Sequence, residues 1–253
     1  ILERDEANNV YAYQMQEGYR VDQCRGLIAL GLFKDYDDIR NSPTQEYGTV
    51  QPGDIKYKDV NGDGVVNDGD IVAIGATSKP NLIYGVGISA TWKGLDVNVH
   101  FQGAGKSTFF TYGKCVYAFS EGEWGNIFKG MLDNRWVDAE TAATLGIKAN
   151  ENPNASYPRL SYQNDGASKN NYRNSTFWLR NGSYLRLKTL DIGYTLPKAL
   201  VNKLHFNNIR IFMVGTNLLT FSDFKTWDPE MGDARGESYP LSKSVTMGIS
   251  VNL

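Results

Sequence analysis

Apolar and polar side chains alternate along several long stretches of this chain, beginning with "LIYGVGISATW" (82–92). Every second residue from Leu82 onward is apolar or aromatic, and mostly glycine, serine and threonine stand between. After Lys93–Gly94, "LDVNVHFQ" (95–102) alternates in the same way. Because successive side chains of a β-strand point to opposite faces, the two segments predict a β-hairpin with a two-residue turn.

Three further segments alternate over similar lengths, namely 183–196, 208–221 and 243–253. Strands of soluble sheets are typically about five or six residues long. These segments run to about ten residues or more, which is the length that a tilted strand needs to cross a bilayer. The pattern therefore favours membrane-spanning strands.

The connections between the expected strands alternate in length. Lys93–Gly94 and residues 197–207 are short, whereas the stretches at about 103–175 and 222–239 are long. Short turns at one end and long loops at the other are typical of outer-membrane β-barrels. The chain is therefore expected to be all-β, with antiparallel strands in a transmembrane barrel and long extracellular loops. A soluble antiparallel sandwich remains the alternative.

One face of each expected strand is continuously apolar, so we expect that face to contact lipid and the other to line a polar lumen. Expected to face lipid are Val97, Val99, Val245, Met247 and Ile249; expected to face the lumen are Asn98, His100, Thr246 and Ser250. Along strand 95–102, the polar residues Asp96, Asn98 and His100 are candidate substrate contacts.

The segment "DVNGDGVVNDGD" (59–70) has the spacing of a twelve-residue calcium-binding loop. Such a loop supplies oxygen from positions 1, 3, 5, 7, 9 and 12 and has Gly at position 6. Aspartate at position 12 has a shorter reach than the usual glutamate. A polar turn without an ion is the alternative. The expected calcium ligands are Asp59, Asn61, Asp63, the Val65 carbonyl, Asn67 and Asp70.

The flanks of this loop indicate a structural ion rather than a regulatory switch. Upstream, "PGDIKYKD" (52–59) alternates as an extended segment, and downstream Gly75 and Pro80 leave no room for a long helix. The motif occurs once, so the helix pair of an EF-hand is not expected. Calcium is therefore expected to pin a loop between strands.

Composition narrows the function classes. A formal net charge of −2 gives no basic footprint for nucleic acid. The chain has 2 cysteines and 2 histidines without zinc-site spacing, and no nucleophile motif indicates an enzyme. Cys24 and Cys115 pair in a disulfide or remain thiols, and the sequence leaves both alternatives open.

Several blocks of the sequence resemble one family in that family's order. They are "GLFKDYDDIRNSP" (31–43), "GDIKYKDVNGDGVVNDGD" (53–70), "NSTFWLRNGSYLRLKTLDIGYTLPK" (174–198), "IRIFMVGTNLLTFSDFKTWDPE" (209–230) and "YPLSKSVTMGISVNL" (239–253). Together they resemble the C-terminal region of SusC/RagA-type TonB-dependent outer-membrane transporters. The chain departs from the family in ending on Leu253 instead of an aromatic residue.

The resemblance implies a segment of a large plugged barrel in the cell outer membrane. It implies import of oligosaccharide or peptide cargo, a SusD-like surface lipoprotein as partner, and coupling to the TonB complex through an N-terminal region outside this chain. Residues 1–81 would form an extracellular region that contains the calcium-type loop, and residues 82–253 the C-terminal barrel strands. Five strands cannot close such a barrel, so we expect a longer parent protein.

Two other function classes stay open on the residues alone. The first is a soluble, calcium-stabilised carbohydrate-binding β domain. The second is a β-rich glycosidase, for which "WDPE" (227–230) and the pair Asp138 and Glu140 offer carboxylates. A barrel segment needs detergent, whereas either alternative purifies from a soluble fraction.

Overall fold

The computed structural model describes residues 11–114, 116–119, 127–151, 153–162, 166–232 and 234–252. The chain forms two compact units, and each unit is built from three separate segments of the sequence. The first comprises Ile1–Ser78, Thr108–Arg180 and Asp233–Glu237, and the second Lys79–Ser107, Asn181–Gly232 and Ser238–Leu253. The expected division into an extracellular region (residues 1–81) and barrel strands (residues 82–253) describes position relative to the membrane. This division stays a prediction.

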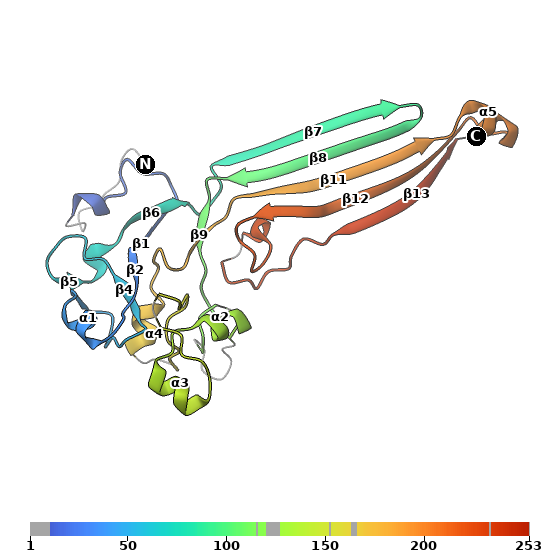
Figure 1. Ribbon diagram of the computed structural model, residues 1–253. Coiled ribbons are helices and arrows are strands. Elements are labelled where there is room, and N and C mark those ends of the chain that lie inside the picture. The colour runs from blue at the N-terminus through green and yellow to red at the C-terminus, as the bar shows by residue number, and fades with distance from the viewer. Residues whose placement is uncertain are drawn as a thin grey trace. The chain divides into compact units, whose positions relative to one another are not determined.

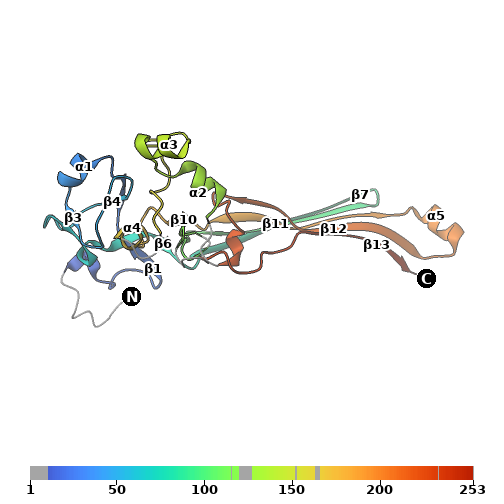
Figure 2. The same ribbon diagram turned by 90° about the horizontal axis from the view of Figure 1, so that it is seen from below.

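In the described chain the second unit is one five-stranded antiparallel sheet, whose strands run side by side in both views (Figures 1 and 2). This confirms the all-β antiparallel fold expected from the alternating segments. The sheet is open in this segment and does not close into a barrel. In spatial order its strands are β13 (Ser244–Asn252), β12 (Asn208–Ser222), β11 (Tyr184–Thr195), β8 (Leu95–Gly105) and β7 (Leu82–Trp92).

The strand registers arrange the side chains in rows across the sheet. One apolar row consists of Ala90, Val97, Ile192, Met213 and Met247. The adjacent row, on the opposite face, consists of Ser89, Asn98, Asp191, Val214 and Thr246. The registers thus place all the residues expected to face lipid on one face and all those expected to line the lumen on the other. The contact of one face with lipid and of the other with a lumen stays a prediction.

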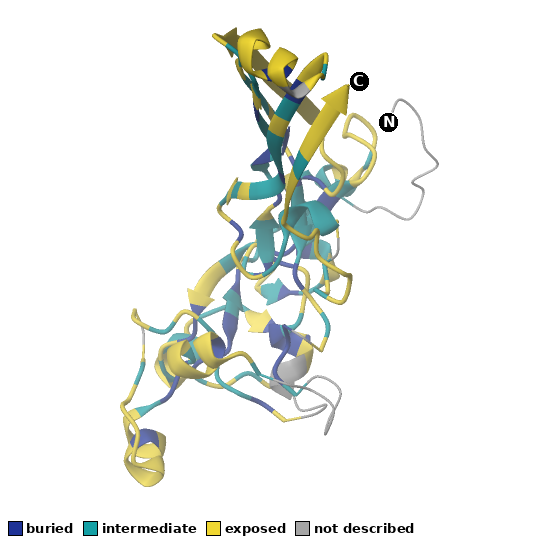
Figure 3. Cartoon of the chain, turned by 90° about the vertical axis from the view of Figure 1, so that its right-hand side faces the viewer, coloured by how far each residue is buried: buried dark blue, intermediate teal, exposed yellow. Residues whose placement is uncertain are grey.

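The apolar face is exposed. Ile88, Met247 and Ile249 show 67%, 77% and 67% of their surface to solvent, and Figure 3 shows β13 exposed along almost its whole length. An apolar surface of this extent marks an interaction site with protein or membrane.

Both short connections lie at the same end of the sheet (Figure 1). The β7–β8 turn uses Lys93 at φ 48° and Gly94 at φ 89°, which is the left-handed geometry of the tight hairpin turns. The β11–β12 connection contains the helix α5 (Lys198–Val201) and the 3₁₀ turn η4 (Asn202–Leu204). The expected alternation of short turns and long connections is confirmed.

The first unit consists of short elements, several of them inside stretches that the sequence analysis treated as loops. Its paired strands are β1 (Gln23–Gly26) with β6 (Val72–Thr77), β2 (Ala29–Leu32) with β4 (Ile55–Tyr57), β3 (Thr44–Gln45) with β5 (Val65–Val66), and β9 (Thr108–Phe110) with β10 (Leu179–Asn181). Its helices and 3₁₀ turns are η1 (Ala12–Gln14), α1 (Tyr36–Arg40), η2 (Asp68–Asp70), α2 (Lys129–Asn134), α3 (Ala139–Leu145) and α4 (Gly166–Asn171). None of the described helices is both long and apolar enough to cross a membrane.

A buried polar network organises this unit. Ile55 of β4 donates its N–H to the Asn171 side chain at 2.8 Å, and its carbonyl accepts from Asn170 at 2.9 Å and from Gln45 at 3.0 Å. Asn171 also donates to the fully buried Asp54 at 3.0 Å. The side-chain amides thus pair with the buried N–H and C=O of Ile55, which have no neighbouring strand of a wide sheet to bond. Buried polar groups require such partners.

Of the two cysteines, Cys24 is buried, and its thiol donates to the Thr108 carbonyl at 3.3 Å. Burial raises the pKa of this thiol. Cys115 lies outside the described residues, so the pairing of the two stays open.

Candidate functional site

The calcium-type loop is shaped by its own acidic side chains. Asp59 accepts from the Gly62 N–H at 2.7 Å and the Gly64 N–H at 2.9 Å, and Asp63 accepts from the Val65 N–H at 2.9 Å. Gly62 and Gly64 adopt φ of 76° and 85°, which other residues rarely reach. The local sequence therefore folds this stretch into successive side-chain-capped turns.

Asp70 closes the loop from its far end. Its side chain is fully buried and accepts from the Val60 N–H at 2.6 Å and from the Asn67 N–H at 2.9 Å. Asn67 accepts from Gly69 at 2.7 Å and donates to Glu46 at 3.1 Å. The last expected ligand is thus held against the start of the same loop by backbone donors.

The donor set is the kind that calcium prefers. Carboxylate, amide and carbonyl oxygens are hard ligands, and the expected set contains nothing else. The Thr44 and Glu46 N–H groups bond the carbonyls of Gly64 and Val66, so the Val65 carbonyl between them points away from β3. Within the described part of the chain, however, no group of three or more His, Cys, Asp and Glu side chains is arranged to hold a metal. The calcium ligands stay a prediction.

The loop is also clamped from outside, which the sequence analysis missed. Tyr13 donates to the Gly69 carbonyl at 2.6 Å, Gln14 donates to the Asp68 carbonyl at 2.8 Å, and Asn61 donates to the Tyr11 hydroxyl at 2.9 Å. Tyr47 donates to Asp68 at 3.0 Å. Burial, with Asp68 beside it, raises the pKa of Tyr47, so its hydroxyl remains a donor at neutral pH.

The candidate substrate residues lie in neighbouring positions on the polar face of the sheet. Asp96 receives the Arg210 guanidinium, with Nε at 3.1 Å, and Arg210 also bonds Asp191 at 2.9 Å. Gly193 makes room for this guanidinium, because a side chain there would collide with it. Asn98 pairs in register with Asp191, and His100 with Thr189. Asp96 is therefore part of an ion triad across β8, β11 and β12.

A second ionic cluster binds the loop after β12 to the same face. The buried Arg186 contacts Asp228, and its Nε lies 3.0 Å from Glu230. Lys188, at a bulge in β11, reaches Glu230 at 2.7 Å. Both carboxylates of "WDPE" are thus neutralised by basic side chains in a folded turn, η5 (Pro229–Met231). This arrangement accounts for them without glycosidase chemistry.

Comparison with known proteins finds TonB-dependent receptors of similar sequence. No family model matches the chain. TonB-dependent receptor P26 of Formosa agariphila is 29% identical over 246 residues, which cover 92% of this chain and 23% of the receptor. TonB-dependent receptor P3 of the same organism is 25% identical over 250 residues, covering 94% of this chain and 22% of that receptor. The chain spans less than a quarter of the length of these relatives.

Solved structures share the fold. The RagAB peptide transporter superposes with a TM-score of 0.62 at 21% identity, covering 90% of this chain and 22% of the matched one. The closed-closed state of the RagAB peptide importer gives 0.63 at 22% identity, covering 90% and 23%. The relatives are receptors and transporters, in agreement with the expectation that the chain is not an enzyme.

Proposed function

We infer that this chain, whose similarity to SusC/RagA-type TonB-dependent receptors the relatives confirm, forms part of the barrel wall of an outer-membrane nutrient importer. The observation that carries this is the sheet of long antiparallel strands, apolar and exposed on one face and polar on the other. In a bilayer the apolar face is covered by lipid and the polar face lines the lumen.

The two edges of the sheet support the proposal that this chain is part of a longer protein. In the described chain β7 and β13 each have a strand partner on one side alone. Hydrocarbon offers no hydrogen-bond partners, so a spanning sheet must close. The wall is therefore completed by strands of the parent polypeptide.

The proposed partners follow from the same family. The RagAB neighbours are described as a peptide transporter and importer, and we propose a SusD-like surface lipoprotein as partner and coupling to the TonB complex through another region of the parent. The cargo is a peptide or an oligosaccharide. Uptake of labelled tri-peptides and trisaccharides by cells with and without the parent protein tests this: loss of neither uptake would contradict the importer function.

The orientation of the strands gives a direct test of the membrane wall. Single cysteines at Asn98 and Thr246, on the polar face, should react with a water-soluble thiol reagent in intact outer membranes. Cysteines at Val97 and Met247 should stay unlabelled, because lipid covers them. The adjacent positions form matched pairs on one strand. Equal labelling within each pair would exclude a barrel wall.

We also propose that the loop 59–70 binds one structural calcium ion. The support is the all-oxygen donor set at the motif spacing and the inward position of Asp70. Terbium, a calcium substitute that nearby tyrosines sensitise, provides the readout through Tyr11, Tyr13 and Tyr47. We expect calcium to displace it with a dissociation constant of about 10⁻⁴–10⁻³ M.

Asp63→Asn should weaken calcium binding about tenfold or more, because one charged ligand is lost while an acceptor for the Val65 N–H remains. Asp68→Asn is the matched control, since Asp68 lies in the loop but outside the expected ligand set and its contact to Tyr47 needs an acceptor alone. Equal effects of the two variants, or no displacement at millimolar calcium, would contradict the site.

A further inference from the structure

The apolar face of the sheet ends in a row of exposed side chains just before the short connections. The strand registers place side by side in this row Trp92, Leu95, Tyr194, Ile211 and Ile249. Trp92 exposes 69% of its surface. Tryptophan and tyrosine are enriched where hydrocarbon meets water, because their rings are apolar and carry one polar group. The row therefore marks the level at which the hydrocarbon around the wall ends.

Beyond this row lie the two short connections of the sheet, and both carry exposed lysines. The β7–β8 turn contains Lys93, and the β11–β12 connection contains Lys198 in α5 and Lys203 in η4. Neither "KG" (93–94) nor "PKALVNKLHFN" (197–207) contains an aspartate or a glutamate. The short-turn end of the sheet thus carries positive charge alone.

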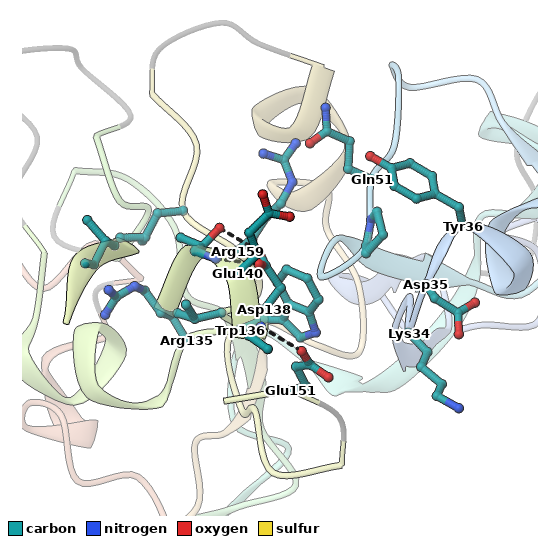
Figure 4. Close-up of a pocket in the computed structure, with 16 residues that line it drawn as sticks. Lys34, Asp35, Tyr36, Gln51, Arg135, Trp136, Asp138, Glu140, Glu151 and Arg159 are labelled. Carbon is teal, nitrogen blue, oxygen red and sulfur yellow. Dashed lines mark hydrogen bonds between the residues drawn. The ribbon is translucent and has the colours of Figure 1, made fainter. Parts of the chain in front are cut away.

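Neighbouring carboxylates do not neutralise this charge. Asp96 and Asp191, which are nearest in the sequence, already bind Arg210. Elsewhere the chain mixes both signs: around the pocket of the first unit that Figure 4 shows, cations and carboxylates lie together, among them Arg135, Arg159, Asp138 and Glu140. The two connections therefore match a partner that is itself anionic.

The geometry of the two connections suits the boundary of a membrane. The Thr195 N–H, at the end of β11, donates to the Gly94 carbonyl at 2.7 Å, which holds the β7–β8 turn beside the start of the other connection. Lys93 lies over the Trp92 ring, with its Nζ 4.9 Å from the ring centre, and Leu200 of α5 exposes 52% of its surface. Each connection thus combines an exposed apolar side chain with cations, as surfaces at the lipid headgroups do.

We propose that the short-turn end of the sheet binds anionic phospholipid headgroups of the adjacent leaflet. The phosphate oxygens contact Lys93, Lys198 and Lys203, while Trp92 and Leu200 lie at the level of the acyl chains. Lysines near a membrane surface attract anionic lipid over about a Debye length. The proposal rests on the barrel-wall function and adds to it the class of lipid that the wall selects at one end.

Spin-labelled lipids test this on the full-length parent reconstituted in phosphatidylcholine vesicles. Lipid in contact with the protein gives a motionally restricted signal, so labelled phosphatidylglycerol can be compared with labelled phosphatidylcholine. We expect phosphatidylglycerol to associate about threefold to tenfold more strongly at low salt, and this preference to shrink as salt rises. Equal association of the two lipids would overturn the proposal while leaving the wall in contact with lipid. A restricted signal from neither lipid would overturn the barrel-wall function as well.

A triple variant locates the preference for phosphatidylglycerol. The three changes are Lys93→Gln, Lys198→Gln and Lys203→Gln. Together they should reduce the preference to less than about twofold, because no lysine remains in the two connections. The matched control removes the same charge from exposed lysines of the first unit and should keep the full preference. Its changes are Lys34→Gln, Lys129→Gln and Lys148→Gln.

Heat-modifiable migration of both triple variants shows that each is folded before its lipid preference is compared. An equal loss of preference in the two variants would show an effect of net charge alone. A preference abolished by millimolar inorganic phosphate would show a site for the free ion, and an unchanged preference in the first variant would assign its lysines to a protein partner. Each of these results would overturn the proposal.

Discussion

Expressed without the rest of its parent protein, this chain should give no folded, heat-modifiable species in outer membranes, whereas the full-length parent should give one. The reason is the pair of edge strands in the described sheet, β7 with 11 residues and β13 with 9. A strand edge leaves about every second residue's N–H and C=O without a partner. Each such group costs several kcal/mol in hydrocarbon, so the open sheet cannot be stable there.

Semi-native gel electrophoresis measures this directly, because a closed barrel migrates differently before and after heating. The control is the parent protein carried through the same membrane preparation. Co-expression of the chain with the remaining part of the parent should restore the shift if the missing strands pair with β7 and β13. A heat-modifiable species formed by the chain alone would contradict the open-sheet argument.

Substitution of Asp54 by alanine should destabilise the first unit by about 3–5 kcal/mol, the usual effect of removing one partner from a buried ion pair. Asp54 is fully buried, forms the pair with Arg159, and accepts from the Gln51 N–H at 2.8 Å and from Asn171. Its loss removes one acceptor each from the Arg159 guanidinium, the Asn171 amide and the Gln51 N–H.

Limited proteolysis of the full-length parent, followed over temperature, reports this change, with cleavage expected in the first unit while the sheet stays protected. Asp37→Ala is the matched control, because Asp37 pairs with Arg40 at an exposed site, where such pairs contribute about 1 kcal/mol or less. If both variants were cleaved at the same temperature, the buried network would not be what holds this unit together.

The sheet could be predicted from the sequence because its signals are local. Period-two alternation identifies each strand, and the turn at Lys93–Gly94 fixes the register of β7 against β8. Once one face of the sheet is known to be apolar, the alternation along β13 assigns each of its residues to one face or the other. The bulge at Lys188 also has a local signal that was missed, because the apolar positions change parity there, from Leu185 and Leu187 to Leu190 and Ile192.

The first unit could not be predicted in the same way, because its structure depends on contacts between residues that are far apart in the sequence. Asn170 and Ile55 are 115 positions apart, and Asn171 and Asp54 are 117 apart, so no periodicity links them. One element had a signal that was missed: Asp138 before α3 and Gly146 after it, at φ 66°, are the expected start and stop of a helix. The tyrosines that clamp the calcium-type loop had no local signal.

The chain passes between its two units at 78/79, 107/108, 180/181, 232/233 and 237/238, each time beyond the end of a long strand of the sheet. The hydrogen-bonded ladder of the sheet is therefore uninterrupted by the segments that build the first unit. Substitutions within residues 108–180 therefore leave the strand pairing of the sheet unchanged, so the two units can change in sequence separately.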